Sequence, residues 1–111
     1  MTSLPLDSDK NSIPALRLKV SGGAHAIAAT AASARNATAI NANTKVVSVY
    51  ATGPVYMRFG DSAITASASD HFFPAGIYYD FAIGGGKVGQ ATYLAVLRAD
   101  TDCTVYVSEK E

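Results

Sequence analysis

The glycine-rich segment at residues 84–89, GGGKVG, is the first stretch whose residues and spacing could do chemistry. It satisfies the G-x-G-x-x-G pattern, in which the backbone of a tight loop lies against the pyrophosphate of a dinucleotide. That chemistry requires a strand before the loop and a helix N-terminus after it. The segment that follows, Tyr93–Ala99, is predicted to be a strand. We therefore expect a flexible loop here and no bound cofactor.

Metal binding and nucleophilic catalysis would depend on His25, His71 and Cys103, since the chain has two histidines and one cysteine. A zinc site needs three or four ligands, usually with pairs at short spacing, and Asp70 beside His71 is the only short pair. No G-x-S-x-G nucleophile motif occurs either. We expect no metal site, histidines that lie at the surface or in an interface, and a small, buried Cys103.

Paired carboxylates are the other possible catalytic group, because glycoside hydrolases place two of them around the scissile bond. Candidates that folding could bring together are Asp61, Asp70, Asp80, Asp100 and Asp102. Most of them lie in expected turns, where aspartate is a common residue. We therefore predict that the protein is not an enzyme. A small β-fold hydrolase, with two carboxylates about 5–10 Å apart in a cleft, stays as an alternative.

Tyrosine is the one enriched residue type with binding potential, and the chain has six of them. Protein interfaces are enriched in tyrosine and arginine, and exposed tyrosines also form platforms on which sugars stack. Tyr50, Tyr56 and Arg58 are expected to share the outward face of a hairpin, and Tyr78 to point outward from its own strand. Simple packing of aromatic rings across neighbouring strands is the other explanation for them.

The strands that must position these tyrosines are clearest at residues 46–60, VVSVYATGPVYMRFG. Apolar residues recur with a period of two on both sides of Thr52-Gly53-Pro54, which predicts a β-hairpin with its turn at these three residues. The face expected to point inward carries Val47, Val49, Ala51, Val55, Met57 and Phe59.

Alternation and turn residues predict further strands at residues 15–20, 24–30, 63–68, 77–83, 93–99 and 103–108. In the first of these, Leu16, Leu18 and Val20 are expected to point inward. Residues 28–39 are rich in alanine, which favours helix, but they lack an apolar stripe at helical spacing, so we expect strand and irregular loop. Residues 109–111 are expected to be a charged end. Strands at this spacing are typical of a sandwich or barrel.

Composition narrows the class of protein further. With 111 residues and a formal net charge of zero, the chain is one domain without the basic surface of a nucleic-acid- or membrane-binding protein. No apolar stretch approaches the ~20 residues that span a bilayer, and the N-terminus lacks the pattern of a signal peptide. A single cysteine excludes an internal disulfide. Abundant alanine buries little apolar surface, which favours an oligomer.

Three segments together resemble small virion proteins of tailed bacteriophages. They are the segment that ends in Arg58-Phe59-Gly60, the Pro74-Ala75-Gly76 turn, and the closing YLAVLRADTDCTVYVSE. The resemblance covers residues 14–109 and rests on pattern, without a diagnostic motif. It implies a short β-sandwich of the kind found among head and tail components. Capsid cement or decoration proteins of this kind commonly bind the outer shell as trimers, often with their termini, and the resemblance implies no catalytic residues.

We therefore predict an all-β, antiparallel, jelly-roll-like sandwich at residues 14–111, preceded by an extended arm at residues 1–13. The resemblance implies a homotrimeric capsid cement protein, made in the host cytoplasm and bound to the major capsid protein on the virion surface, without nucleic acid or membrane. The expected contact residues are Leu4, Pro5 and Leu6 in the arm and Tyr50, Tyr56 and Arg58 on the hairpin. The alternative is a tail, neck or head-fibre component that binds a receptor or carbohydrate.

Overall fold

The computed structural model describes residues 17–84 and 89–110, and within these ranges it has eight β-strands and no helix. The all-β prediction is confirmed. The expected arm at residues 1–13 lies outside the described residues, as does most of the glycine-rich segment. The strands are β1 (Ala24–Ala29), β2 (Ala34–Arg35), β3 (Val46–Ala51), β4 (Val55–Gly60), β5 (His71–Phe73), β6 (Tyr78–Ala82), β7 (Tyr93–Arg98) and β8 (Cys103–Lys110).

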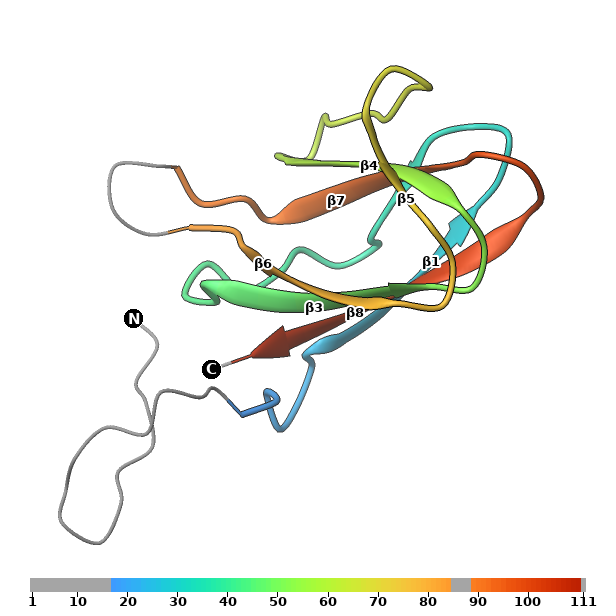
Figure 1. Ribbon diagram of the computed structural model, residues 1–111. Coiled ribbons are helices and arrows are strands. Elements are labelled where there is room, and N and C mark those ends of the chain that lie inside the picture. The colour runs from blue at the N-terminus through green and yellow to red at the C-terminus, as the bar shows by residue number, and fades with distance from the viewer. Residues whose placement is uncertain (1–16, 85–88, 111) are drawn as a thin grey trace, which may run out of the picture.

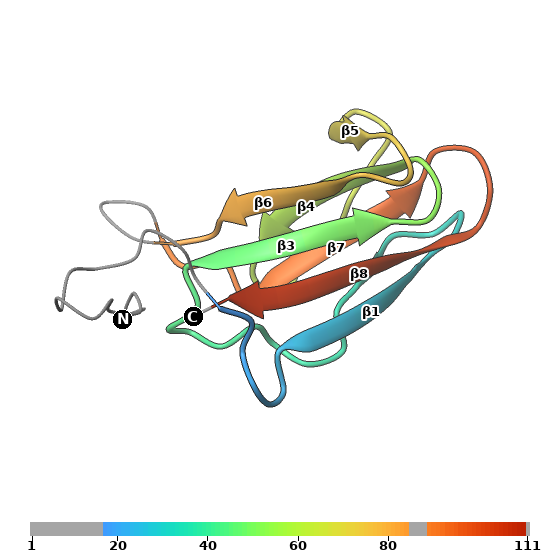
Figure 2. The same ribbon diagram turned by 60° about the horizontal axis from the view of Figure 1, so that its bottom comes forward.

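The strands form two antiparallel sheets, which we call sheet I (order β1-β8-β3-β6) and sheet II (order β2-β7-β4-β5). Figure 1 shows the two sheets as facing layers, and Figure 2 shows the four strands of sheet I side by side. The chain pairs like one long hairpin rolled into two layers: β4 with β5, β3 with β6, β2 with β7, and β1 with β8. This is the jelly-roll form of a β-sandwich, as the sequence predicts.

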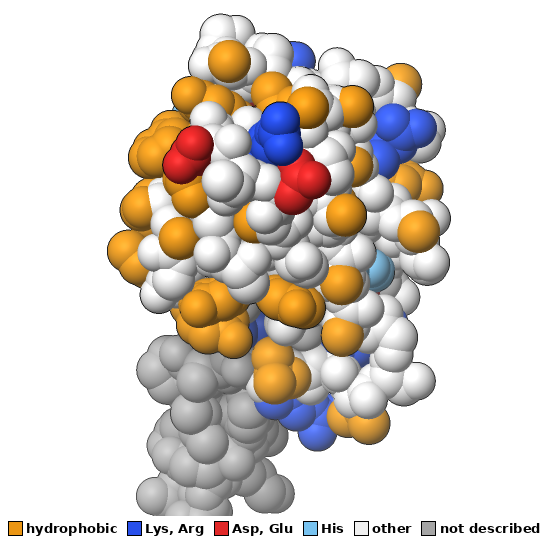
Figure 3. All heavy atoms as spheres, turned by 90° about the vertical axis from the view of Figure 1, so that its right-hand side faces the viewer, with side chains coloured by type: hydrophobic (Ala, Val, Ile, Leu, Met, Phe, Trp, Pro, Cys, Tyr) orange, Lys and Arg blue, Asp and Glu red, His pale blue; other side chains and the backbone are white. Residues whose placement is uncertain are grey.

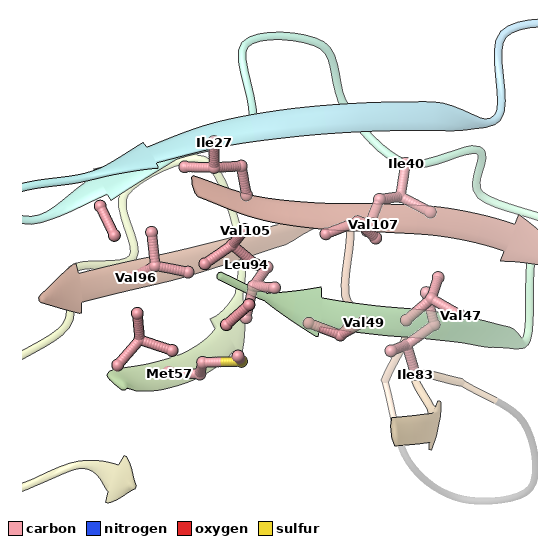
Figure 4. Close-up of a cluster of buried hydrophobic side chains, with 13 residues drawn as sticks. Ile27, Ile40, Val47, Val49, Met57, Ile83, Leu94, Val96, Val105 and Val107 are labelled. Carbon is pink, nitrogen blue, oxygen red and sulfur yellow. The ribbon is translucent and has the colours of Figure 1, made fainter. Parts of the chain in front are cut away.

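The core is filled by side chains from both sheets. Residues of a strand point alternately to its two faces, so every second side chain of β3 and β8 reaches the interior. Figure 4 shows these side chains meeting those of sheet II between the layers, with Ile40 and Ile83 added from connecting segments. Fully buried members include Val47, Val49, Val105 and Val107 of sheet I and Val55, Leu94 and Val96 of sheet II.

The expected hairpin at residues 46–60 is wrong, although both of its strands exist. β3 pairs with β6 and β8 in sheet I, whereas β4 pairs with β5 and β7 in sheet II. The Thr52-Gly53-Pro54 turn therefore carries the chain from one sheet to the other. A Cβ at Gly53 would lie 2.8 Å from the Cβ of Cys103, so the crossing packs directly against the start of β8.

Two of the predicted strands do not form within the described residues, and Leu16, expected to point inward, lies outside them. From residue 17 onward, the segment expected at 15–20 makes only a bridge between Leu18 and Lys110 and a hydrogen bond from Lys19 N–H. No described strand covers its apolar side, so Leu18 is 61% exposed and Val20 84% exposed, not buried. Residues 63–68 form no strand because side chains take up their backbone donors. The Ser33 hydroxyl accepts the N–H of Ala66 in this way.

The predicted strand at 103–108 is correct but too short, because β8 continues to Lys110. Two glycines expected in turns between strands do lie in turns. Gly22 and Gly76 adopt positive φ angles of 71° and 81°, which glycine reaches without the clash of a Cβ. Gly76 lies in the turn that joins β5 to β6, and its N–H donates to the carbonyl of Ala51.

Leu94→Ala is expected to lower the free energy of unfolding by about 2–5 kcal/mol, because it removes a fully buried side chain and leaves a cavity. Leu18→Ala is the matched control, since Leu18 is mostly exposed, and we expect a change within about 0.5 kcal/mol. Urea unfolding followed by circular dichroism measures both. Equal losses in the two variants would contradict the described placement of Leu18.

Candidate functional site

Three tyrosines form a row across the outer face of sheet I, and we call them the tyrosine row. Tyr78 of β6 lies opposite Tyr50 of β3, and Tyr50 lies opposite Tyr106 of β8. Their neighbours Val49 and Val107 point into the core, so alternation sends all three rings outward. Neighbouring strands are about 4.8 Å apart, and the row therefore extends across roughly 10 Å of the face that Figure 2 turns toward the viewer.

Two rings of the tyrosine row contact each other, and the row is still exposed to solvent. The centroids of Tyr50 and Tyr78 are 4.7 Å apart with an interplanar angle of 38°, which is the cross-strand aromatic contact common on sheets. Tyr78 nevertheless remains 70% exposed and Tyr106 48% exposed. Cross-strand packing thus accounts for part of this arrangement and leaves a large aromatic surface in contact with solvent.

A carboxylate with fixed partners lies beside the tyrosine row. Asp80 of β6 is opposite Ser48 of β3, one outward position from Tyr78 along the strand. It accepts hydrogen bonds from the Ser48 hydroxyl and from the Lys110 ammonium, the latter at 3.1 Å. These two hydrogen bonds, with Ser48 contributing most, hold the pKa of Asp80 below its ordinary value. The outer face of sheet I therefore combines exposed aromatic rings with an oriented anionic group.

The predicted site residues do not form one surface. Tyr50 belongs to the tyrosine row, but Tyr56 and Arg58 lie on the outer face of sheet II, on the other side of the molecule. There Tyr56 makes an edge contact with Phe72 of β5, with ring centroids 5.7 Å apart. The grouping of these residues fails because β3 and β4 are not a hairpin. Leu4, Pro5 and Leu6 lie outside the described residues.

Sequence reasoning missed that Tyr106 joins Tyr50 and Tyr78. The local alternation indicates that each of these side chains points outward, but only the long-range register places them in one row. The jelly-roll pairing supplies that register, since it sets both β6 and β8 against β3. Only a correct prediction of which strands pair would therefore have identified the row from the sequence.

A second polar group is buried at one end of the sandwich. Glu109, expected in a charged end, is only 2% exposed because β8 turns its side chain inward. Its carboxylate receives hydrogen bonds from the Thr44 hydroxyl at 2.6 Å and from the Asn41 N–H at 3.0 Å, and it pairs with His25 Nε2 at 2.7 Å. His25, expected at a surface or interface, is buried with it. The structure corrects both expectations.

The charge of Glu109 is stabilised despite its burial. Burial alone would raise its pKa, since a low-dielectric interior disfavours the ionised form. The hydrogen bonds from Thr44, His25 and the Asn41 amide outweigh that effect and leave the pKa of Glu109 below its ordinary value. Glu109 thus ties β8 to β1 and to the segment that leads into β3, and it has the character of a structural anchor.

A pocket of about 520 Å³ lies between the sheets at their open side and is lined by Met57, Arg58, Phe59, His71, Phe73 and Phe81. No carboxylate lines it, so the cleft with paired carboxylates that a hydrolase would need is not found there among the described residues. Within residues 17–84 and 89–110, no group of three or more potential metal ligands occurs. The described chain also has no helix long and apolar enough to cross a membrane.

The end of the sandwich at the turn between β7 and β8 carries few charged side chains (Figure 3). Figure 3 views the end of the sandwich where β7 turns into β8, and it shows hydrophobic and uncharged side chains with a few acidic and basic ones between them. Arg98 and Asp102 form an ion pair at this turn. Comparison of the chain with protein-family models, with curated proteins and with solved structures found no match. The functional argument therefore depends on the geometry of this chain.

Glu109→Gln is expected to lower the free energy of unfolding by about 1–3 kcal/mol near pH 7, because it removes charge from a buried, hydrogen-bonded carboxylate. Since the folded-state pKa lies below the ordinary 4.5, the stabilisation by the ionised group is present above that pH and is lost as the pH falls through the folded-state value. The difference between the two proteins should therefore shrink in acid.

Urea unfolding at a series of pH values measures this effect. The control is Asp102→Asn, which changes an exposed carboxylate and should alter stability by less than about 0.5 kcal/mol. A difference between Glu109→Gln and the wild type that stays constant from pH 7 to about pH 3 would show that the charge of Glu109 does not stabilise the fold.

Proposed function

We propose that this protein is a structural component of a tailed-phage virion, a capsid cement protein that docks on the shell through the outer face of sheet I. The observation that carries the proposal is the tyrosine row, in which Tyr78 and Tyr106 remain exposed on the outer face of sheet I. Tyrosine contributes large contact area at low conformational cost and is enriched among residues that dominate binding energy.

The size of this face supports a multivalent contact. The four strands of sheet I are five to eight residues long, and at a spacing of about 4.8 Å they give a face of roughly 400 Å². A standard interface buries about 800 Å² on each partner, so the face alone supplies about half of that area. Several copies joined in one oligomer reach specific binding through avidity, because each later contact forms at high effective concentration. A trimer on a symmetric shell, bound to the major capsid protein, fits this requirement.

The neutral charge of the chain fits the same function. A formal net charge of zero gives no long-range attraction to nucleic acid. Contacts made by tyrosine rings depend little on salt, because they involve no net charge. This property suits a protein that holds a shell together over a wide range of ionic conditions.

Carbohydrate binding is the second candidate, in a tail, neck or head-fibre component. It is favoured by the position of Asp80 beside the tyrosine row, because sugar sites combine aromatic rings with carboxylates that accept hydrogen bonds from hydroxyls. The contact between Tyr50 and Tyr78 weighs against it, since each ring covers part of the face on which a sugar would stack. We therefore place shell docking first.

The double variant Tyr78→Ala/Tyr106→Ala is expected to lose co-sedimentation with empty capsids, with the apparent Kd rising at least about tenfold, because it removes the exposed rings of the row. Tyr56→Ala is the matched control, as it removes a tyrosine from the outer face of sheet II, and it should bind like the wild type. Wild-type protein that ignores capsids, or a double variant that binds normally, would refute docking through sheet I.

A glycan array with the wild-type protein and the same double variant tests the second candidate. Under the shell-docking proposal, neither protein binds any glycan. Binding by the wild type that the double variant loses would establish the tyrosine row as a sugar site instead. Binding that both proteins share would place a sugar site elsewhere on the molecule.

A further inference from the structure

The pocket at the open side of the sandwich lies where the two sheets end. β5 is the end strand of sheet II and β6 the end strand of sheet I. β5 pairs with β4 only from Val55 to Met57, so at Arg58 and Phe59 the side of β4 away from β7 has no strand beside it within the described residues. The pocket of about 520 Å³ opens at this gap.

The walls of the pocket are aromatic and incompletely covered. Phe81 of β6 contacts Phe59 of β4 and Phe73 of β5, with centroid distances of 5.4 Å in both pairs. These three rings bridge the two sheets, yet each is only half-buried, whereas Met57 behind them is 2% exposed. Apolar surface of this kind, concave and still in contact with water, is typical of a binding site.

Two of the residues that line the pocket, Arg58 and His71, carry polar side chains. Among residues 17–84 and 89–110, the side chains of Arg58 and His71 make no hydrogen bond or ion pair. The guanidinium is always charged and can hold a carboxylate with two parallel hydrogen bonds, and an imidazole can add another donor. The pocket therefore fits an extended apolar peptide followed closely by a carboxylate.

The sequence before the described chain contains such a peptide, Leu4-Pro5-Leu6-Asp7. Its two leucines match the aromatic walls, and Asp7 is complementary in charge to Arg58. Proline fixes its own φ and biases the residue before it toward extended backbone, which reduces the entropy lost on binding. Asp7 lies ten residues before Arg17, where the described chain begins, and ten extended residues reach up to about 35 Å.

The position at which the described chain begins favours a neighbouring copy as the donor. Leu18 bridges to Lys110 of β8 and leads into β1, at one edge of sheet I, whereas β6 and the pocket lie at the opposite edge. A peptide from the same chain would have to pass around the sandwich, but a second copy can approach the open side directly. We propose that the pocket binds Leu4-Pro5-Leu6-Asp7 of a neighbouring copy, which deepens the cement function and rests on it.

Such an exchange joins two different surfaces of the protein, the peptide of one copy and the pocket of the next. Contacts of this kind form a closed ring when the rotation between copies permits it. The exchange therefore accounts for how a small, alanine-rich domain assembles into the oligomer that multivalent docking requires.

Disulfide trapping between two purified full-length variants tests the proposal. One carries Leu6→Cys, the other carries His71→Cys, and both carry Cys103→Ser. Mixed and mildly oxidised, they are expected to form a covalent heterodimer as the main product. The matched control replaces His71→Cys with Thr101→Cys, an exposed position in the turn before β8, and should yield little heterodimer. No heterodimer in the first mixture would overturn the proposal, as would equal trapping at Thr101.

A charge swap without cysteines provides an independent test. Arg58→Glu should raise the dissociation constant of the oligomer about tenfold by analytical ultracentrifugation, because two carboxylates then face each other. Adding Asp7→Arg to the same chain should restore assembly, which a merely misfolded variant would not do. An oligomer unaffected by Arg58→Glu, or a double variant without rescue, would contradict the proposed contact.

These outcomes are separable from those for shell docking. Trapping without any capsid binding would leave the peptide exchange in place and refute the cement function. Capsid binding that depends on the tyrosine row, without trapping, would refute the exchange and leave the cement function in place.

Discussion

The buried carboxylate of Glu109 is the constraint on which the rest of the architecture depends. It joins β8 to His25 of β1 and to Thr44, which precedes β3, and so connects the central strands of sheet I at one end. An ionised group in the interior is tolerated only when its oxygens are satisfied. A shift of β8 by one residue would turn Glu109 outward and Tyr106, the tyrosine of that strand, inward. The register that buries Glu109 is therefore the register that places Tyr106 in the tyrosine row.

The positions of strands such as β3 and β4 could be predicted from the sequence, but which strands pair with each other could not. Alternation in Val46–Ala51 and Val55–Gly60 locates β3 and β4 to the residue, because a half-buried strand must alternate. The same pattern also fits a hairpin, and nothing local distinguishes a hairpin turn from a crossing between sheets. Leu18 and Val20 show the converse error: they alternate like a strand, yet no described neighbour covers them.

The candidate site was harder to predict than the fold, since it depends on contacts between distant residues. Tyr50 could be recognised as outward-facing, but its place in a row with Tyr106 follows from a pairing across more than fifty positions. The residues next to Glu109 in the sequence indicate an exposed charge. Its burial could not be predicted because its partner His25 is 84 positions away. The aromatic pocket likewise requires strands of both sheets, so no motif of consecutive residues marks it.

The pairing of β1 with β8 has a consequence for how the protein is made. These strands come from the two ends of the folded body, and their ladder runs from Ala24 opposite Ser108 to Ala29 opposite Cys103. A chain emerging from the ribosome cannot close sheet I until its final strand has been translated. Folding of such a non-local topology is slow, and an incomplete chain exposes unpaired strand edges. We therefore expect this domain to fold in one cooperative step that begins only after β8 has been synthesised and can reach β1.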